Sequence, residues 1–161
     1  MCRLKVIKER VVQDVRPIIA AGIGGFALIF LLGWLGESLN QPLVLGSFGA
    51  TCVLVFGFPE LPFSRPRNVI LGHALTSFIG LVCLTLLDAT PWSMALAVAA
   101  GIMAMMATKT VHPPAGSNPV IIFSTHPSWS FLLAPTLAGA VLIIWFGLLY
   151  NRLARRTSLS R

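Results

Sequence analysis

Four apolar segments, each of about the length that crosses a lipid bilayer, dominate this sequence. They cover residues 17–35, 69–87, 93–107 with an extension toward 111, and 131–150. A transmembrane helix needs roughly 20 apolar residues to span the hydrocarbon core. Only 11% of the residues are charged, whereas about a quarter of a soluble globular domain is charged. The pattern predicts a membrane protein with four long helices and excludes a water-soluble enzyme, a disordered chain and a coiled coil.

Two shorter apolar segments are interrupted by helix-breaking residues. The first, 43–58, contains three glycines, and the second, 113–123, contains one glycine and three prolines. A shift of 67 residues aligns these segments and several residues beyond them. The aligned positions include 49–56 with 116–123, Gly72 with Gly139, and Gly80 with Gly147. We therefore predict an all-α polytopic membrane protein of two inverted repeats, each built as helix, broken segment, helix, with four long transmembrane helices and two short broken ones.

The distribution of charge predicts how the chain crosses the membrane. There are 12 Lys and Arg against 5 Asp and Glu. If both broken segments cross and the N-terminus is inside, all 12 basic residues lie inside, as the positive-inside rule requires. If the broken segments instead re-enter, three basic residues are left outside. We favour six crossings, and the re-entrant arrangement stays open. Six crossings place Arg65, Arg67 and Lys109 inside and Glu37, Asp88, Trp34, Trp92 and Trp129 on the outer side, whereas the re-entrant arrangement would put the three basic residues outside and Asp88 inside.

The same features divide the chain into three parts. Residues 1–16 carry five basic residues between apolar residues near helical spacing, which predicts an arm on the anionic cytoplasmic membrane surface. Residues 17–150 form one transmembrane domain, with the repeats at 17–88 and 93–150, and residues 151–161 form a basic cytoplasmic tail. We expect a multi-pass protein of the bacterial plasma (inner) membrane with both termini in the cytoplasm.

The two breaks are the candidate binding site. Non-helical backbone at membrane depth leaves N–H and C=O groups that must face protein, water or a ligand. Each break places small, hydroxyl or amide residues before an apolar half-helix, whose first N–H groups favour an anion. We expect the breaks to meet near the bilayer midplane, with close helix packing as the alternative role for the small residues. The candidate binding residues are Ser47, Gly49, Ala50, Thr51, Gly116, Ser117 and Asn118.

The second break begins with a recognisable motif. His112-Pro113-Pro114-Ala115-Gly116 resembles the signature of the HPP family of integral membrane proteins. The resemblance also covers residues 46–51 and 66–68 in the expected order and spacing, and it extends over roughly 17–150. It implies a small transporter-like protein with four transmembrane helices. Because some members of this family are implicated in nitrite transport, the resemblance also names nitrite as a candidate substrate.

Basic side chains near this motif extend the candidate site. Lys109 and His112 are three residues apart, so on a helix they would project from one face at the inner end of the fourth span. Such a pair could recruit an anion or relay a proton; alternatively, His112 holds a backbone carbonyl freed by the prolines. His73 suits a helix–helix hydrogen bond and a transport pathway equally well. Arg67 is a further pathway candidate, with anchoring at the lipid headgroups as its alternative.

These features favour a transporter or channel for a small anion over a structural or sensory membrane subunit. An enzyme is not expected, because Ser47 or Ser117 beside a histidine has no third group that would orient the base. The sequence has no nucleotide-binding motif and no set of metal ligands, so no ATP-driven pump, metal or cofactor is expected. The expected partners are membrane lipid, a small anion and further copies of the chain, since small residues recur at four-residue spacing. Nucleic acid is not expected.

Overall fold

The computed structural model describes residues 15–159, with side chains up to residue 154. This part of the chain consists of helices and their connections, without a strand, which confirms the all-α prediction for it. The predicted interfacial arm lies outside the described residues except for its last two positions, which belong to the first turn of α2 (Val15–Leu39).

Three helical stretches are long and apolar enough to cross a membrane. They are α2, α4 (Pro66–Leu86) and the stretch Trp129–Ala154. The last stretch consists of η4 (Trp129–Leu132), η5 (Leu133–Leu137) and most of α7 (Ala138–Leu159). The remaining predicted long helix, at 93–107, corresponds to α5 (Pro91–Ala107), which has 17 residues. It is therefore shorter than the roughly 20 residues of a typical spanning helix.

The first broken segment combines an extended stretch with a short helix. Residues 42–45 are non-helical and lead into α3 (Gly46–Cys52), which continues as the π-helix η1 (Val53–Gly57). A short 3-10 turn, η2 (Pro62–Ser64), then leads to the start of α4. The non-helical stretch thus lies just before Gly46, whereas residues 46–51, where the sequence predicts the break, are helical.

The second broken segment is built in the same way. Residues 110–112 are non-helical and lead into the 3-10 helix η3 (Pro113–Ser117) and then α6 (Asn118–Thr125). His112 is extended, with φ −135° and ψ 98°, because the ring of a following proline disfavours helical geometry in the residue before it. Pro113 therefore holds His112 in extended geometry at the end of this break.

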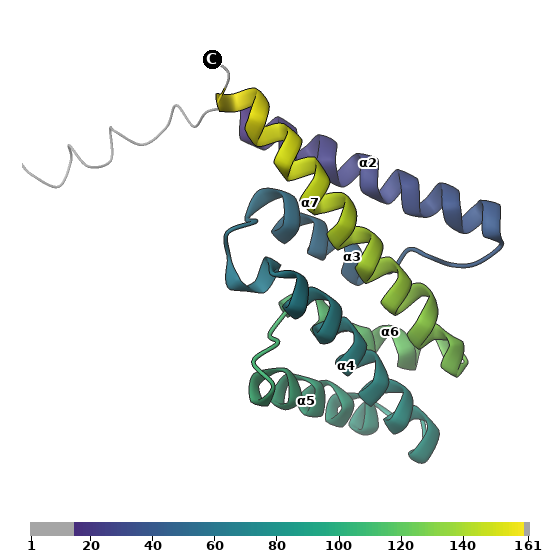
Figure 1. The fold of residues 1–161 in the computed structure, drawn as a ribbon. Helices are drawn as coiled ribbons and strands as arrows, with labels where there is room; N and C mark the ends of the chain where they lie inside the picture. The colour runs from purple at the N-terminus through teal and green to yellow at the C-terminus, as the bar shows by residue number, and fades with distance from the viewer. Residues whose placement is uncertain (1–14, 160–161) are drawn as a thin grey trace, which may run out of the picture.

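The long helices surround the two short ones (Figure 1). The start of α2 and the end of α7 lie at the same end of the molecule (Figure 1), where Tyr150 Oη donates a hydrogen bond to Ala20 O at 2.7 Å. Helix α4 packs along α5 and also contacts α6 and α7, so it occupies the middle of the bundle. The core that these helices share includes Phe48, Leu81 and Ile122.

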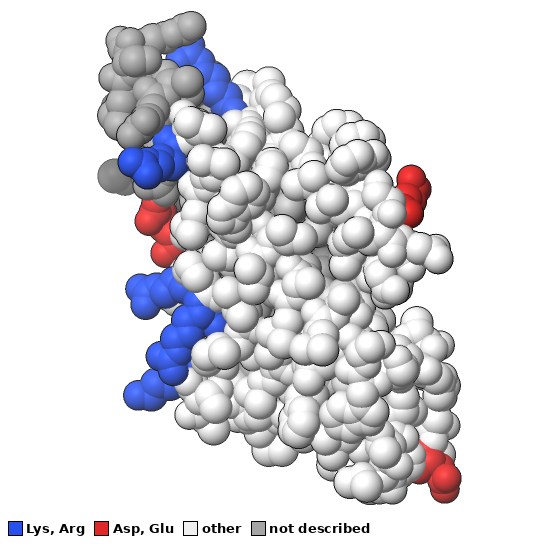
Figure 2. Space-filling view, turned by 45° about the vertical axis from the view of Figure 1, so that its right-hand side comes forward, with Lys and Arg blue, Asp and Glu red and all other residues white. Residues whose placement is uncertain are grey.

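Charged side chains are distributed unevenly over the surface. Figure 2 shows the Lys and Arg side chains gathered along one edge, while Asp and Glu side chains occur at both edges. The basic residues whose side chains are described are Arg16, Arg65, Arg67, Lys109 and Arg152, and all are exposed. The rest of the visible face lacks charge, as expected of a surface that meets lipid.

Glycines allow the short helices to approach α4 and α7 closely. A Cβ added at Gly80 would lie 2.9 Å from Ile122 Cδ1 and 3.1 Å from the Cα of Pro119, and a Cβ added at Gly147 would clash with Val55. Gly80 and Gly147 are 67 residues apart, as are Val55 and Ile122. Helix α4 therefore contacts α6 of the other half of the chain, and α7 contacts η1 of the first half, at positions that correspond under the 67-residue shift.

Candidate functional site

A cluster of polar side chains lies fully buried where the two broken segments meet α4. We call Thr51, His73, His112 and Asn118 the polar centre; each has 0% of its side chain exposed. They come from α3, α4, the connection before η3, and α6. The bundle thus encloses four polar side chains from four separate segments, although apolar residues usually fill such a core.

The four side chains form one continuous chain of hydrogen bonds. Thr51 Oγ1 lies 3.0 Å from His73 Nε2 and 2.9 Å from His112 Nε2. Asn118 Nδ2 lies 3.0 Å from His73 Nδ1, and His112 Nδ1 lies 2.8 Å from the carbonyl oxygen of Phe63. Thr51 therefore links both histidines, and His73 links the two broken segments.

Local backbone geometry brings the histidines together. A Cβ at Gly72 would lie 2.9 Å from His112 Cβ and 3.2 Å from Thr110 O, so only a glycine lets the 110–112 connection lie this close to α4. The rings of His73 and His112 are then 5.0 Å apart between centroids. On its other side, His73 meets the ring of Phe48 at 5.2 Å in an edge-to-face arrangement.

Further hydroxyl groups adjoin the polar centre, and two buried polar atoms in this region have no partner. Asn118 Nδ2 also donates to Ser77 Oγ at 2.9 Å, and Ser77 Oγ lies 3.1 Å from Thr136 Oγ1. By contrast, Ser47 Oγ and Asn118 Oδ1 are buried without a hydrogen-bond partner. A buried polar atom of this kind costs roughly 1–3 kcal/mol, so it marks a position that a ligand or water can satisfy.

The structure separates the predicted site residues into two groups. Ser47, Thr51 and Asn118 from the breaks, together with His73 and His112, are buried in or beside the polar centre. The other predicted residues lie at or toward the surface: Gly49, Ala50, Arg67, Lys109 and Ser117 are exposed, and Gly116 is half-buried. A Cβ added at either glycine would meet no atom within 4 Å.

Lys109 and His112 do not share a helix face, contrary to the sequence prediction. Helix α5 ends at Ala107, and Lys109 adopts a left-handed conformation with φ 56°. Lys109 is exposed while His112 is fully buried. The reason is that the prolines after His112 prevent helical geometry there, and the turn at Lys109 redirects the chain into the bundle.

The start of α4 holds this connection in place. Arg67 Nη2 donates to Thr108 O at 3.3 Å, and Asn68 Nδ2 donates to Val111 O at 2.9 Å. Arg67 therefore binds the backbone that leads to His112 while its side chain remains exposed. These bonds satisfy carbonyl groups that the non-helical backbone cannot pair internally.

Ser77 and Thr136 belong to the site but were not identified from the sequence. Ser77 follows His73 by four residues, which places both on one face of α4. This spacing of polar residues in an apolar helix is a signal that could have identified Ser77. Thr136, a single hydroxyl residue in η5, carries no comparable signal. The carbonyl of Phe63, like any backbone group, could only be identified from the fold.

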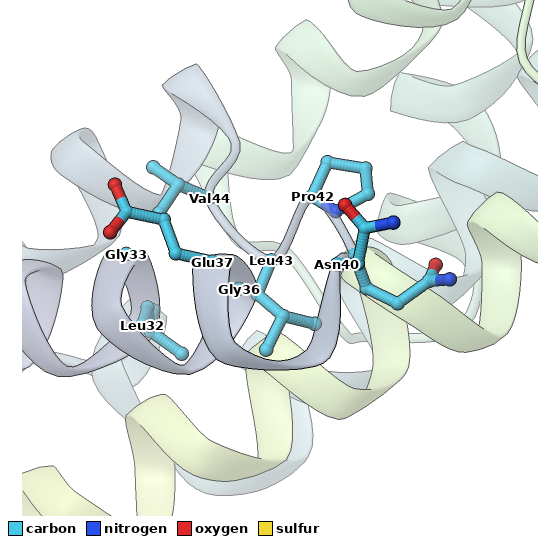
Figure 3. Close-up of a pocket in the computed structure, with 9 residues that line it drawn as sticks. Leu32, Gly33, Gly36, Glu37, Asn40, Pro42, Leu43 and Val44 are labelled. Atoms are coloured by element: carbon cyan, nitrogen blue, oxygen red, sulfur yellow. The ribbon is translucent and has the colours of Figure 1, made fainter.

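Two surface grooves lie elsewhere. One, of about 380 Å³, lies between the end of α2 and the extended stretch before α3 (Figure 3). The Glu37 carboxylate and the Asn40 amide line it, so its charge does not suit an anion. A second groove, of about 430 Å³, runs along α2, α3 and η1 and is lined mainly by apolar residues and glycines, Gly49 among them.

Over residues 15–159, no three His, Cys, Asp or Glu side chains gather in a way that could hold a metal ion.

The chain is similar to a known family of transmembrane proteins. Residues 10–159 match the family model described as HPP, transmembrane region. Two transmembrane proteins of Dictyostelium discoideum are each 36% identical to the chain, one over 94% of the chain and 57% of its own length, the other over 70% of the chain and 39% of its own length. The chain thus spans about half the length of the curated relatives it matches. No solved structure matches. The match over nearly the whole chain confirms the resemblance carried by residues 112–116: this is a transmembrane protein of the HPP family.

Proposed function

We propose that the chain is a membrane transporter or channel for a small anion, and that the anion passes through the polar centre. The observation that carries this proposal is the buried meeting of both broken segments on His73, with the hydroxyl of Ser47, which can donate to an anion, left without a partner one helical turn before Thr51. A membrane bundle that serves only as a scaffold has no need of such groups, because polar side chains in a membrane interior are costly.

Surface charge supports an anion as the substrate. The exposed cations lie along one edge of the molecule (Figure 2), and Lys109 precedes the buried His112 by only three positions. A positive potential at one end of a pathway raises the local concentration of anions there. The polar centre itself contains no Lys or Arg, so an anion would not be trapped by a permanent positive charge.

An inverted-repeat architecture is part of the proposal. Thr51 and Asn118 are 67 residues apart and both contact His73. The contacts of Gly80 with Ile122 and of Gly147 with Val55 are likewise exchanged between the halves. These pairs support two halves that are related by a pseudo-two-fold axis through the polar centre, as in transporters with inverted repeats. Six membrane passages and cytoplasmic termini follow from this arrangement and from the positive-inside rule.

Cysteine labelling tests this topology. In a background without the natural cysteines, Arg65→Cys and Lys109→Cys should react with a membrane-impermeant maleimide only after the membrane is opened. Glu37→Cys and Asp88→Cys should react in intact cells, because six crossings place them on the opposite side. Labelling of position 65 or 109 from outside would contradict six crossings.

Uptake into liposomes tests the transport function itself. Purified protein in liposomes should accelerate the entry of at least one small anion from a panel of nitrite, nitrate, formate and chloride, relative to protein-free liposomes. Nitrite is the first candidate because of the family resemblance. If none of these anions enters faster than in protein-free liposomes, the chain is a structural or sensory subunit and the proposal is wrong.

We do not propose a catalytic step. Ser47 Oγ has no hydrogen-bond partner, and Ser117 Oγ donates to Pro114 O at 2.8 Å. Neither serine is therefore activated by a histidine, as a nucleophile would need to be. The homo-oligomer and the bacterial plasma membrane are also proposals, and neither is shown. Ala97 and Gly101, two of the small residues that suggest contacts between copies, pack inside the chain, Gly101 against Thr76. Both relatives are eukaryotic. A single monomer mass in mild detergent and in lipid would exclude the oligomer.

A further inference from the structure

We propose that His112 binds a proton that accompanies the anion through the polar centre, an inference that rests on the proposed function. The protein would then be a proton–anion symporter. Three features of the polar centre support this: its hydrogen-bond directions, its lack of compensating charge, and the different surroundings of its two histidines.

The partners of the ring nitrogens determine where hydrogens can lie. The Phe63 carbonyl only accepts, so His112 Nδ1 carries a hydrogen and donates to it. The Asn118 amide nitrogen only donates, and its bond to His73 O at 3.3 Å is consistent with this orientation. One amide hydrogen points to Ser77 Oγ and the other is shared between His73 O and His73 Nδ1. His73 Nδ1 is therefore an acceptor, and His73 Nε2 carries the hydrogen and donates to Thr51 Oγ1.

The Thr51 hydroxyl has two alternative acceptors at the same distance. It lies 2.9 Å from Ser47 O and 2.9 Å from His112 Nε2. When His112 is neutral, Thr51 can donate to the bare Nε2. When His112 is protonated, Nε2 donates to Thr51 Oγ1, and the hydroxyl hydrogen turns to Ser47 O. Rotation of one hydroxyl group therefore accommodates the added proton, while every other hydrogen bond is kept.

His73 has no such alternative. A second proton on its ring would lie on Nδ1 and would face the Asn118 amide donor at 3.0 Å. Two donors facing each other lose the hydrogen bond and repel. Of the two histidines, only His112 can gain a proton without breaking an existing bond.

The charges around His112 make proton and anion binding mutually favourable. His73 is the titratable group that faces it, and the polar centre and the hydroxyl groups beside it include no carboxylate. An anion that enters the polar centre alone finds no positive counter-charge there, and a proton bound to His112 alone finds no negative one. When both are bound, the protonated histidine and the anion neutralise each other. Linkage then requires that each raises the affinity for the other by the same factor. The other ionisable side chains on α3, α4 and the two connections next to them are Cys52, which is buried, Cys83, which is half-buried, and Glu60, Arg65, Arg67 and Lys109, which are exposed.

The proton balance of one transport step is simple. The Nε2 lone pair takes a proton from hydronium, which leaves water, and on release the proton returns to water on the other side. No covalent bond to the anion forms, and one anion moving with one proton carries no net charge. The initial rate of anion uptake should therefore be independent of membrane voltage and should rise as the pH outside falls.

Proteoliposomes with a pH-sensitive dye in the lumen test this with sodium nitrite as the probe. Rates in protein-free liposomes are subtracted, because nitrous acid crosses lipid unaided. We expect the lumen to acidify as nitrite enters, with up to about a tenfold higher initial rate for a tenfold rise in outside proton concentration. A potassium diffusion potential of either sign should leave the nitrite rate unchanged.

A matched pair of variants locates the proton. His112→Asn keeps a donor for Phe63 O but cannot hold the proton, so its remaining nitrite uptake should lose its dependence on outside pH and its lumen acidification. His126→Asn, which alters an exposed residue in a left-handed position that asparagine tolerates, should keep both. Wild-type nitrite uptake that is driven by voltage and moves no proton would overturn the symport while leaving anion transport intact. Absence of uptake for every anion would overturn both proposals.

Discussion

Anion uptake should be almost abolished in Asn118→Asp, although the substitution hardly changes the size of the side chain. It places a carboxylate in the polar centre, beside His73. At an effective dielectric constant of about 20, two like charges about 4 Å apart repel by roughly 4 kcal/mol, which corresponds to nearly a thousandfold loss of affinity. The measurement is the initial rate of anion uptake into liposomes at a concentration well below saturation.

Ser117→Asp is the matched control, because it adds the same charge one residue away. Ser117 is exposed, whereas Asn118 is fully buried, so solvent should screen the added charge and leave uptake within a few-fold of wild type. Equal uptake by Asn118→Asp and the wild type would place the anion pathway outside the polar centre. Equal loss in both variants would point to a general effect of negative charge on the protein.

Thr51→Val should reduce both transport and stability. Valine keeps the shape of threonine but removes the hydroxyl that links the two histidines. His73 Nε2 and His112 Nε2 then lose their shared partner inside the bundle, and a buried polar group left without a partner costs about 1–3 kcal/mol. We expect a lower thermal unfolding midpoint in detergent and a loss of anion uptake of about tenfold or more, since the pathway loses its central hydrogen-bonding group.

Thr125→Val separates this effect from the loss of an ordinary threonine hydroxyl. Thr125 Oγ1 donates to Ile121 O at 2.9 Å, four residues earlier, just as Thr51 Oγ1 donates to Ser47 O at 2.9 Å. However, Thr125 is exposed and bonds to no histidine. Its variant should unfold and transport like the wild type. If both valine variants behave alike, the histidine contacts of Thr51 have no special role in the protein.

The properties that depend on short stretches of chain could be predicted well. Apolar runs of about 20 residues indicate helices that enter a membrane, because the bilayer excludes unpaired polar groups. Prolines indicate where helices break, because their rings act on the backbone of their immediate neighbours. The second break lies next to Pro113, as predicted, whereas the first lies at residues 42–45 and the predicted stretch 46–51 is helical. The motif at 112–116 correctly indicated the family.

The choice of residues that face inward could not be predicted from these local signals. Within the first break, Ser47 and Thr51 turn inward while Gly49 and Ala50 turn outward; within the second, Asn118 is buried beside an exposed Ser117. These choices depend on contacts between distant parts of the chain. Thr51 forms hydrogen bonds with His73, 22 residues later in the sequence, and with His112, 61 residues later. Asn118 bonds to His73, which precedes it by 45 residues.

Lys109 shows the limit of sequence reasoning most clearly. Helical spacing paired it with His112, but the turn after α5 leaves Lys109 at the surface and carries His112 into the bundle. Sequence spacing describes neighbours along one helix, whereas burial follows from which groups can complete their hydrogen bonds away from water. His112 finds Thr51 and the Phe63 carbonyl there, and an ammonium group would need a counter-charge that the polar centre does not supply.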